Sequence, residues 1–408
     1  MLAAALLSAL LSPNAHAEEP PEDGFSMGAL PAVNYNSDEG FGYGAIGTGY
    51  WYRDGLQPYK YALTLRFFMT TKNIHAHMIR LDGLDIGGLP LRVWAETGYR
   101  STLAANFCGL VGDGHCGDDA ASVATAAGEA AGLTGDDLST FASRYYLMRY
   151  TEPYGLFNLR WKLSDKPHRV EVMAGYRGSY YFPGTPGEVS PWPNSLYQSS
   201  YHTDGETGFS SVLQAGMMFD NRDNEPAPNS GYWSEFSVRG AAPVWGSAWS
   251  WAGVNLTHRQ YASILPEKLV SATRLVLDAT WGDMPFAEIS RFGGSRDYSG
   301  LGGQYGGRGM RAWRYLGQVK ALGQQELRYT FARIAPGTQT FAFGLVGFFD
   351  YGFAARDFSD LSINDSGYGT GTGLRVTWNE NFIVRVDAGF SPVEDWGNKL
   401  YINLDHIF

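Results

Sequence analysis

The segment KYALTLRFFMT, residues 60–70, alternates apolar and polar side chains along its whole length. One face carries Tyr61, Leu63, Leu65, Phe67 and Met69. The other face carries Lys60, Thr64, Arg66 and Thr70. A period of two residues is the pattern of a β-strand whose faces meet different surroundings. Segments 269–281 and 382–390 repeat this pattern and place charged residues in mid-strand, opposite an apolar face.

About sixteen segments of this kind are separated by clusters of Gly, Pro, Asn and Asp, which predicts an all-β chain. The expected strands are 27–36, 41–52, 60–70, 75–86, 91–101, 144–162, 169–182, 209–222, 232–244, 249–264, 269–282, 319–334, 340–354, 371–379, 382–392 and 399–408. Short connections alternate with long ones, and the long ones are 102–143, 183–208, 283–318 and 355–370. This alternation is typical of a transmembrane antiparallel β-barrel. A soluble β-sandwich, which also alternates along its strands, is the alternative fold.

The composition agrees with a barrel. Aromatic residues make up 15% of the 408 residues, glycines number 52, and only 18% of residues are charged. Aromatic girdles and outward apolar faces account for such a mixture. The formal net charge of −10 gives no electrostatic footprint for nucleic acid, which excludes that class of partner.

The first seventeen residues, MLAAALLSALLSPNAHA, have an apolar stretch followed by a small-x-small pattern that ends at Ala17. This pattern predicts a signal peptide over 1–17 and a single outer-membrane barrel domain over 18–408. A buried N-terminal strand or helix is the alternative for 1–17. Because the strand number is even, both termini are expected on the same side of the membrane, in the periplasm.

Cys108 and Cys116 are the only cysteines, and both lie in the long connection 102–143. Export to an oxidising compartment favours a disulfide between them. A zinc site that adds His115 is the alternative, but its ligand number and spacing are poor. The same connection has an Ala-rich part that predicts one or two short surface helices.

Four segments in order identify a family resemblance. They are FDNRDNEPAPNSGYWSEFSV (219–238), YGGRGMRAWRYLGQ (305–318), GFFDYG (347–352) and GTGLR (371–375). Together they resemble the bacterial surface antigen barrels, the superfamily of BamA and the two-partner-secretion transporters. The second segment holds Arg308, Gly309 and Met310, which is similar to the family's Arg-Gly-aromatic loop tip with methionine in the aromatic position.

The pleat places three charged residues on the inner face of the barrel without help from the resemblance. Glu326, Asp350 and Arg375 each alternate with apolar neighbours that face outward. The resemblance implies that the sixth outer loop folds into the lumen and that Arg308 pairs there with Asp350 and Glu326. In one interpretation these residues only hold a plug-like loop in place.

The last segment, KLYINLDHIF (399–408), alternates and ends on Phe408. It resembles the sorting signal read by the outer-membrane assembly machinery. One more last strand is the simpler interpretation.

The resemblance implies a role in the assembly or translocation of outer-membrane protein or lipid. Between Ala17 and the first strand lie only about ten residues, EEPPEDGFSM, too few for the periplasmic POTRA modules of the family. We therefore expect a separate periplasmic or surface protein partner, besides outer-membrane lipid. The alternative is a surface barrel with a structural, partner-binding or passive pore role.

No arrangement of residues predicts an enzyme, a cofactor or a metal. FGGSRDY (292–298) lacks the second glycine of a nucleophile elbow. His75 and His77 share a strand face and would suit a metal, but no third ligand is evident, so a place in the girdle or lumen is the favoured interpretation.

Overall fold

The computed structural model describes most of the chain. The described residues are 23–36, 40–71, 73–111, 116–117, 119–165, 168–184, 195–200, 207–266, 268–296, 298–337, 339–362, 365–379, 382–404 and 406–408. The segment expected to be a signal peptide, 1–17, and His115 lie outside them.

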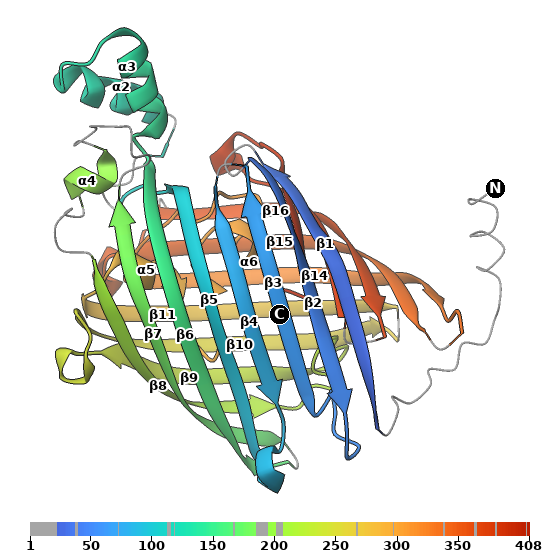
Figure 1. Ribbon diagram of the computed structural model, residues 1–408. Helices are drawn as coiled ribbons and strands as arrows, with labels where there is room; N and C mark the ends of the chain where they lie inside the picture. Colours follow the sequence, from blue (N-terminus) through green and yellow to red (C-terminus); the bar gives the residue numbers. More distant parts are fainter. Residues whose placement is uncertain are drawn as a thin grey trace, which may run out of the picture.

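Within this part of the chain, sixteen strands form one antiparallel sheet in chain order, and the sheet curves into a barrel (Figure 1). The strands are β1 (Gly24–Asn36), β2 (Gly40–Tyr52), β3 (Tyr61–Thr70), β4 (His75–Gly83), β5 (Leu91–Asn106), β6 (Leu147–Ser164), β7 (Arg169–Gly184), β8 (Gly208–Asp220), β9 (Gly231–Ala241), β10 (Ser250–Leu265), β11 (Leu269–Asp283), β14 (Val319–Ile334), β15 (Phe341–Ala355), β16 (Ser366–Trp378), β17 (Phe382–Phe390) and β18 (Lys399–Leu404). The all-β barrel predicted from the alternation is confirmed, and each expected segment corresponds to one strand.

The helices and the two short extra strands lie in the connections. The α-helices are α2 (Ala120–Ala130), α3 (Gly135–Arg144), α4 (Leu196–Ser200), α5 (Phe286–Ile289) and α6 (Gly303–Gly306). The 3-10 helices are η2 (Ile86–Gly88), η3 (Pro243–Trp245), η4 (Phe358–Asp360) and η6 (Pro392–Glu394). The extra strands are β12 (Arg291–Phe292) and β13 (Tyr298–Ser299), which pair with each other. No helix among the described residues is both long and apolar enough to cross a membrane.

Alternation along the strands sets the two faces of the barrel wall. In β15, Leu345 and Phe349 are about half exposed on the outer face. Asp350, which lies between Phe349 and Tyr351, is fully buried on the inner face. The same holds in β14, where Leu327 is exposed and Glu326 is buried. The barrel therefore has an apolar outside and a charged inside, as the period of two residues predicts.

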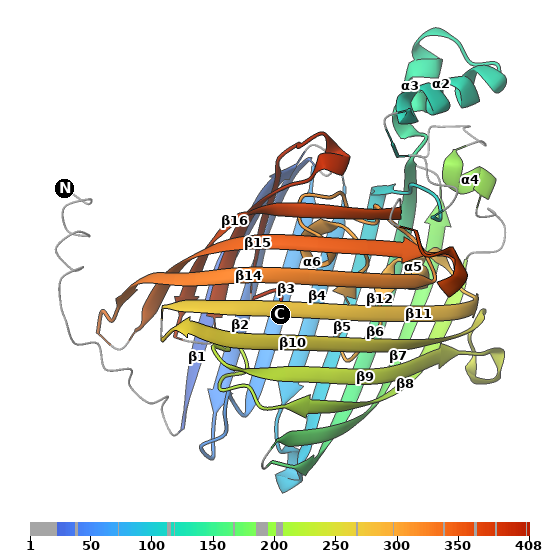
Figure 2. The same ribbon diagram turned by 180° about the vertical axis from the view of Figure 1, so that it is seen from behind.

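The two ends of the barrel differ in the length of their connections (Figures 1 and 2). One end, called here the long-loop rim, carries the hairpin loop (107–146), the helix α4 and the lumen loop (284–318). The other end, the short-turn rim, carries turns such as 266–268 and 335–340. The longest connections lie at one rim, as predicted, but the alternation does not hold at the start of the chain, where 71–74 at the long-loop rim is shorter than 53–60 and 84–90 at the other rim.

The hairpin loop has two parts. Helices α2 and α3 pack against each other and project beyond the long-loop rim (Figure 1). Gly128 of α2 lies so close to Leu138 and Phe141 of α3 that a Cβ atom there would approach Leu138 Cδ1 to 2.5 Å. Beneath the helices, aromatic side chains of several loops form a buried cluster that includes Phe107, Phe141 and Phe286. This cluster covers part of the long-loop rim.

Candidate functional site

The lumen loop lies inside the barrel, where Figures 1 and 2 show α5 and α6 enclosed by the strands. Its tip residues Arg308 and Met310 are fully buried. Gly309 between them has a φ of +94°, and a Cβ atom there would lie 2.6 Å from the backbone of Phe390. Only glycine fits this combination of left-handed backbone and close approach to the wall.

Arg308 binds Asp350 through three donors. Its backbone N–H and its Nε–H donate to Asp350 Oδ2 over 2.9 and 2.8 Å, and Nη2 donates to Oδ1 over 2.8 Å. Nη1 donates to Glu326 Oε1 over 2.6 Å and to Asp387 Oδ2 over 3.3 Å. The guanidinium lies over the ring of Phe348, with Cζ 3.5 Å from the ring centroid. A charged group with so many partners offsets the cost of its burial.

Arg375 belongs to the same cluster and binds two of the carboxylates that hold the loop tip. Its Nη1 donates to Asp387 Oδ1 over 2.6 Å, and its Nη2 donates to Glu326 Oε1 over 3.4 Å. Arg328 donates through Nε to Glu326 Oε2 over 2.8 Å. Glu326 and Asp387 thus connect the arginine of the loop to arginines of the wall.

Asp387 was not among the predicted site residues. It is fully buried, and it accepts hydrogen bonds from both Arg308 and Arg375. The alternation in 382–390 places Asp387 on the inner face, so the pattern that identified Asp350 also contained the signal for Asp387.

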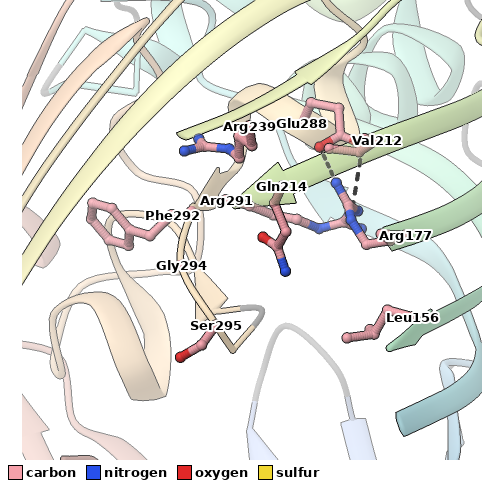
Figure 3. A pocket seen from close by; sticks show the side chains of 11 residues that line it. Leu156, Arg177, Val212, Gln214, Arg239, Glu288, Arg291, Phe292, Gly294 and Ser295 are labelled. Carbon is pink, nitrogen blue, oxygen red and sulfur yellow. Dashed lines mark hydrogen bonds and ion pairs between the residues drawn. The ribbon is translucent and has the colours of Figure 1, made fainter. Parts of the chain in front are cut away.

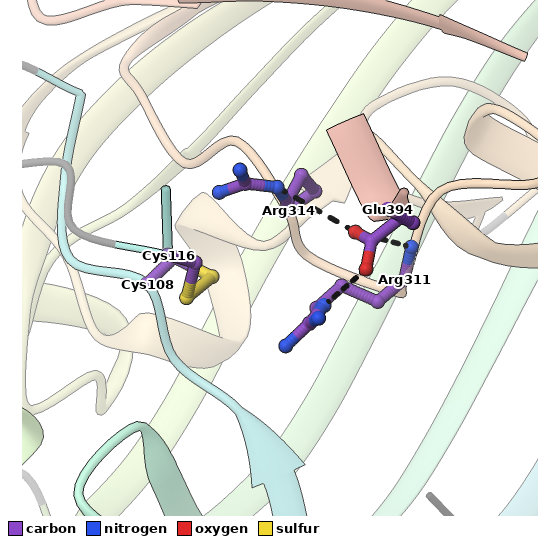
Figure 4. The surroundings of a disulfide bond; sticks show 5 residues. All are labelled: Cys108, Cys116, Arg311, Arg314 and Glu394. Carbon is purple, nitrogen blue, oxygen red and sulfur yellow. Dashed lines mark hydrogen bonds and ion pairs between the residues drawn. A yellow bond between two sulfur atoms is a disulfide. The ribbon is translucent and has the colours of Figure 1, made fainter. Parts of the chain in front are cut away.

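The loop tip is joined to the last strand as well. Gly309 N–H donates to the hydroxyl of Tyr401 over 3.1 Å. Asn403 Nδ2 donates to Gln304 Oε1 and to the Tyr305 hydroxyl, each over 2.8 Å. Near the long-loop rim, Arg311 Nε donates to Glu394 Oε2 over 2.7 Å (Figure 4). The loop therefore supports the wall from β14 to β18.

The first limb of the lumen loop is held by the opposite wall. Ser295 donates through its backbone N–H and its hydroxyl to Glu235, both over 2.6 Å. Asn158 Nδ2 donates to Ser295 O over 2.6 Å. Ion pairs also join Arg291 to Glu152. Because one limb binds β6 and β9 while the tip binds β14 to β18, the loop crosses the lumen.

A solvent-connected space of roughly 440 Å³ remains between the first limb and the wall of β6 to β9 (Figure 3). Arg177, Arg239 and Arg291 line it. Arg177 pairs with Glu288, and Arg239 Nη2 lies 2.9 Å from Asp278 Oδ1. Since these cations have carboxylate partners, the space is a gap in an ionic network rather than a cationic pocket.

A second ionic cluster lies at the short-turn rim, where the turn 221–230 folds beneath the barrel. Glu225 accepts hydrogen bonds from Arg92 Nη1 over 2.8 and 3.0 Å. Burial raises the pKa of Glu225, but Arg92, Arg222 and Arg169 outweigh burial and hold that pKa well below its ordinary value. The turn belongs to the segment 219–238 that carries the family resemblance.

Cys108 and Cys116 form a disulfide, which confirms the pairing predicted from the sequence. Figure 4 shows the bond beside the lumen loop. Within the closed ring, Leu110 forms a parallel bridge to Leu316, and Val111 N–H donates to Leu316 O over 2.8 Å. The hairpin loop therefore holds the second limb of the lumen loop.

The expected last strand is too long. β18 ends at Leu404, and Phe408 lies inside the barrel instead of on the outer face with Leu400 and Ile402. Phe408 O accepts a hydrogen bond from Arg328 Nη2 over 2.7 Å, and Ile407 is buried beside Tyr261. The polar lumen binds the backbone of these residues, which alternation alone does not reveal.

A sixteen-stranded barrel whose lumen is crossed by a loop with an Arg-Gly tip defines a class of outer-membrane protein. The Omp85 superfamily domain matches residues 136–393, and the chain belongs to this superfamily. The chain is an outer-membrane β-barrel of this superfamily.

Three solved structures are similar to this chain at low sequence identity. CdiB from Escherichia coli matches with a TM-score of 0.57 at 10% identity, over 93% of this chain and 61% of that one. BamA from Haemophilus ducreyi lacking POTRA domains 1–3 matches with a TM-score of 0.48 at 14% identity, over 94% and 69%. CdiB from Acinetobacter baumannii matches with a TM-score of 0.46 at 14% identity, over 94% and 66%. No curated protein matches the sequence.

Proposed function

We propose that this barrel assembles or translocates outer-membrane protein or lipid through the seam between its first and last strands. The observation that carries the proposal is the construction of this seam. Among the described residues, β1 and β18 are adjacent, yet no backbone ladder joins them, whereas every other neighbouring pair in the barrel has one. A strand edge without partners is a ready template for an incoming strand.

The two sides of the seam differ in their support. Tyr401 and Asn403 tie β18 to the lumen loop. Gly28 of β1 instead lies under the ring of Phe382, the first residue of β17, where a Cβ atom would approach Phe382 Cδ2 to 2.6 Å. Since β1 has a small packing contact and β18 has hydrogen bonds, opening of the seam moves β1 and leaves β18 in place.

An engineered disulfide tests the seam. A Cβ atom at Gly28 lies 2.7 Å from Phe382 Cγ. The two Cβ atoms of Gly28→Cys and Phe382→Cys are then at most about 4.2 Å apart, within the range of a disulfide. The oxidised double variant is expected to fail in a depletion strain, and a reductant is expected to restore growth and the outer-membrane proteome. Each single cysteine variant is the matched control.

Depletion of the protein supplies the direct test of function. We expect altered levels of outer-membrane proteins, secreted proteins or surface lipid, measured by mass spectrometry of the isolated membrane. An unchanged outer membrane after depletion contradicts the proposal, and so does an oxidised seam variant that complements fully.

We further propose that a separate protein partner delivers the cargo from the periplasm, with the short-turn rim and both chain termini facing that compartment. The connections at this rim, such as 266–268 and 335–340, are too short to capture a polypeptide. A partner that co-purifies from gently solubilised membranes supports this arrangement, and a lone monomer argues against it. The outward apolar face then contacts membrane lipid.

The projecting pair of helices favours a second candidate function, a partner-binding surface barrel. α2 and α3 stand clear of the rim and expose Asp136, Asp137 and Glu129. Replacement of 120–144 by a short Gly-Ser linker separates the candidates. If this variant does not rescue the depletion phenotype, the result supports a role for the helices. If it rescues the phenotype fully, the result supports the seam alone.

A further inference from the structure

Two histidines lie side by side at the end of β4 that adjoins the long-loop rim. His75 and His77 are two residues apart and so share the outer face of the strand, with Ile79 exposed further along it. His75 Nδ1 lies 3.3 Å from His77 Nε2. When no ion is bound, one ring can donate an N–H to the other across this separation.

The same separation suits one shared metal ion. Two imidazole nitrogens that bind one Zn²⁺ at about 2.0–2.1 Å in tetrahedral geometry lie about 3.3 Å apart. The two facing nitrogens therefore already have the spacing of a chelating pair. No backbone movement is needed to bring them together.

Asn73 orients the first ring. His75 Nε2 lies 2.8 Å from Asn73 Oδ1, and because an amide oxygen only accepts, the proton of a neutral His75 sits on Nε2. Nδ1, which faces His77, then carries the lone pair. A histidine that ligates a metal commonly donates its other N–H to such an oxygen, which fixes its tautomer.

Aromatic neighbours fix the second ring. His77 stacks on Phe67 with ring centroids 4.4 Å apart and lies parallel to Tyr99 at 6.3 Å. A ring held in this way loses little conformational entropy when it binds an ion. Both histidines are half-buried, and the turn before His75 is exposed at Thr71 and Asn73, so an ion in solution has access to the pair.

We propose that His75 and His77 form a chelating site for a divalent transition metal ion of the zinc class, with Asn73 as the orienting residue. Imidazole nitrogen is a preferred ligand of Zn²⁺ and Cu²⁺. Among the described residues no third His, Cys, Asp or Glu completes the set, so water fills the other positions of the ion. The site faces outward and is independent of the seam and of the lumen loop.

Calorimetric titration of the full, detergent-solubilised chain with ZnCl₂ tests the proposal. The protein carries no polyhistidine tag, and the buffer contains no chelator. The expected result is one saturable site for each chain. Because both nitrogens bind the same ion, His75→Gln and His77→Gln alone are each expected to weaken binding by about 100-fold, as much as the double variant.

Cu²⁺ provides a spectroscopic measurement of the same site. Electron paramagnetic resonance of the copper-loaded protein is expected to show coupling to two imidazole nitrogens, and the signal is expected to disappear in either single variant. Asn73→Gly, which keeps the positive φ of 57° accessible, is expected to weaken Zn²⁺ binding by about tenfold.

His258→Gln is the matched control, since His258 also lies in a strand but has no histidine two residues away. Circular dichroism of each variant verifies that the barrel folds. The proposal is overturned if the double variant binds Zn²⁺ like the unaltered protein. It is also overturned if each single variant keeps the affinity and merely halves the stoichiometry, because the histidines then act independently.

Discussion

Arg308 shows how a single residue can fix a loop of more than thirty residues inside a barrel. All of its hydrogen bonds go to carboxylates of three different strands, and both the arginine and its partners are fully buried. A planar fork of donors matches carboxylates in a way that a lysine ammonium does not. The position therefore favours arginine over any other cation.

Replacement of Arg308 by alanine is expected to release the tip of the lumen loop. Asp350 would then be buried without its main partner, which costs roughly 3–5 kcal/mol, whereas Glu326 keeps Arg328 and Arg375. The measurements are the urea midpoint of the barrel and proteolysis within the lumen loop, both in detergent. Arg308→Lys is expected to recover only part of the loss. Arg53→Ala, on an exposed turn, is the control and should leave both unchanged.

Glu225 supports a prediction about pH. A carboxyl whose pKa is lowered by folding stabilises the protein fully above its unfolded pKa of about 4.3, and this stabilisation is lost as the pH falls through the folded value. The melting temperature of Glu225→Gln should therefore lie below that of the unaltered protein at pH 7 and at pH 5 by a similar amount. Below about pH 4 the difference should shrink. A difference that grows on acidification would contradict the assigned role.

At the scale of elements, the success of each prediction from the sequence depends on what the underlying pattern encodes. Alternation of apolar and polar residues determines both the strands and the inner face, so it was sufficient to place Glu326, Asp350 and Arg375 in the lumen. It does not encode which wall a loop approaches. The contact of Ser295 with Glu235 and the inward course of Phe408 arise from tertiary hydrogen bonds, which have no local signature in the sequence.

The disulfide ring and the lumen loop are expected to respond together. In Cys108→Ser with Cys116→Ser, the ring no longer restrains Val111, and the hydrogen bond to Leu316 O should open more often. Hydrogen exchange should accelerate at residues 109–111 and around Leu316. Exchange near Arg308 should stay slow, because its ion pairs are independent of the ring. Unchanged hydrogen exchange at both segments would show that the disulfide ring does not restrain either of them.

At the scale of the whole molecule, the barrel is filled rather than open. The lumen loop crosses from β6 and β9 to β18, and aromatic side chains of several loops cover part of the long-loop rim. The seam between β1 and β18 then lies in a wall that is rigid on the β18 side and lightly held on the β1 side. Such a design suits passage at the edge of the barrel better than passage through its centre.

Electrical recordings in planar bilayers test whether the filled lumen prevents the passage of ions. The unaltered barrel is expected to conduct little, since ionic networks occupy the lumen. Removal of the loop tip, 303–313, is expected to give sustained channels, because it removes both Arg308 and the contacts with β18. Deletion of α2 and α3 serves as the control and should not raise the current. High conductance of the unaltered protein would favour a passive pore.

The hairpin loop also has a consequence for how the protein can vary. Its root binds the lumen loop through Leu110 and Val111, whereas a Cβ atom added at Gly132, between α2 and α3, would meet nothing within 4 Å. Exposed connections of this kind accept insertions without harm to the fold. The tip of the hairpin loop can therefore change while its root stays constant, and a foreign peptide inserted at Gly132 should leave the barrel intact.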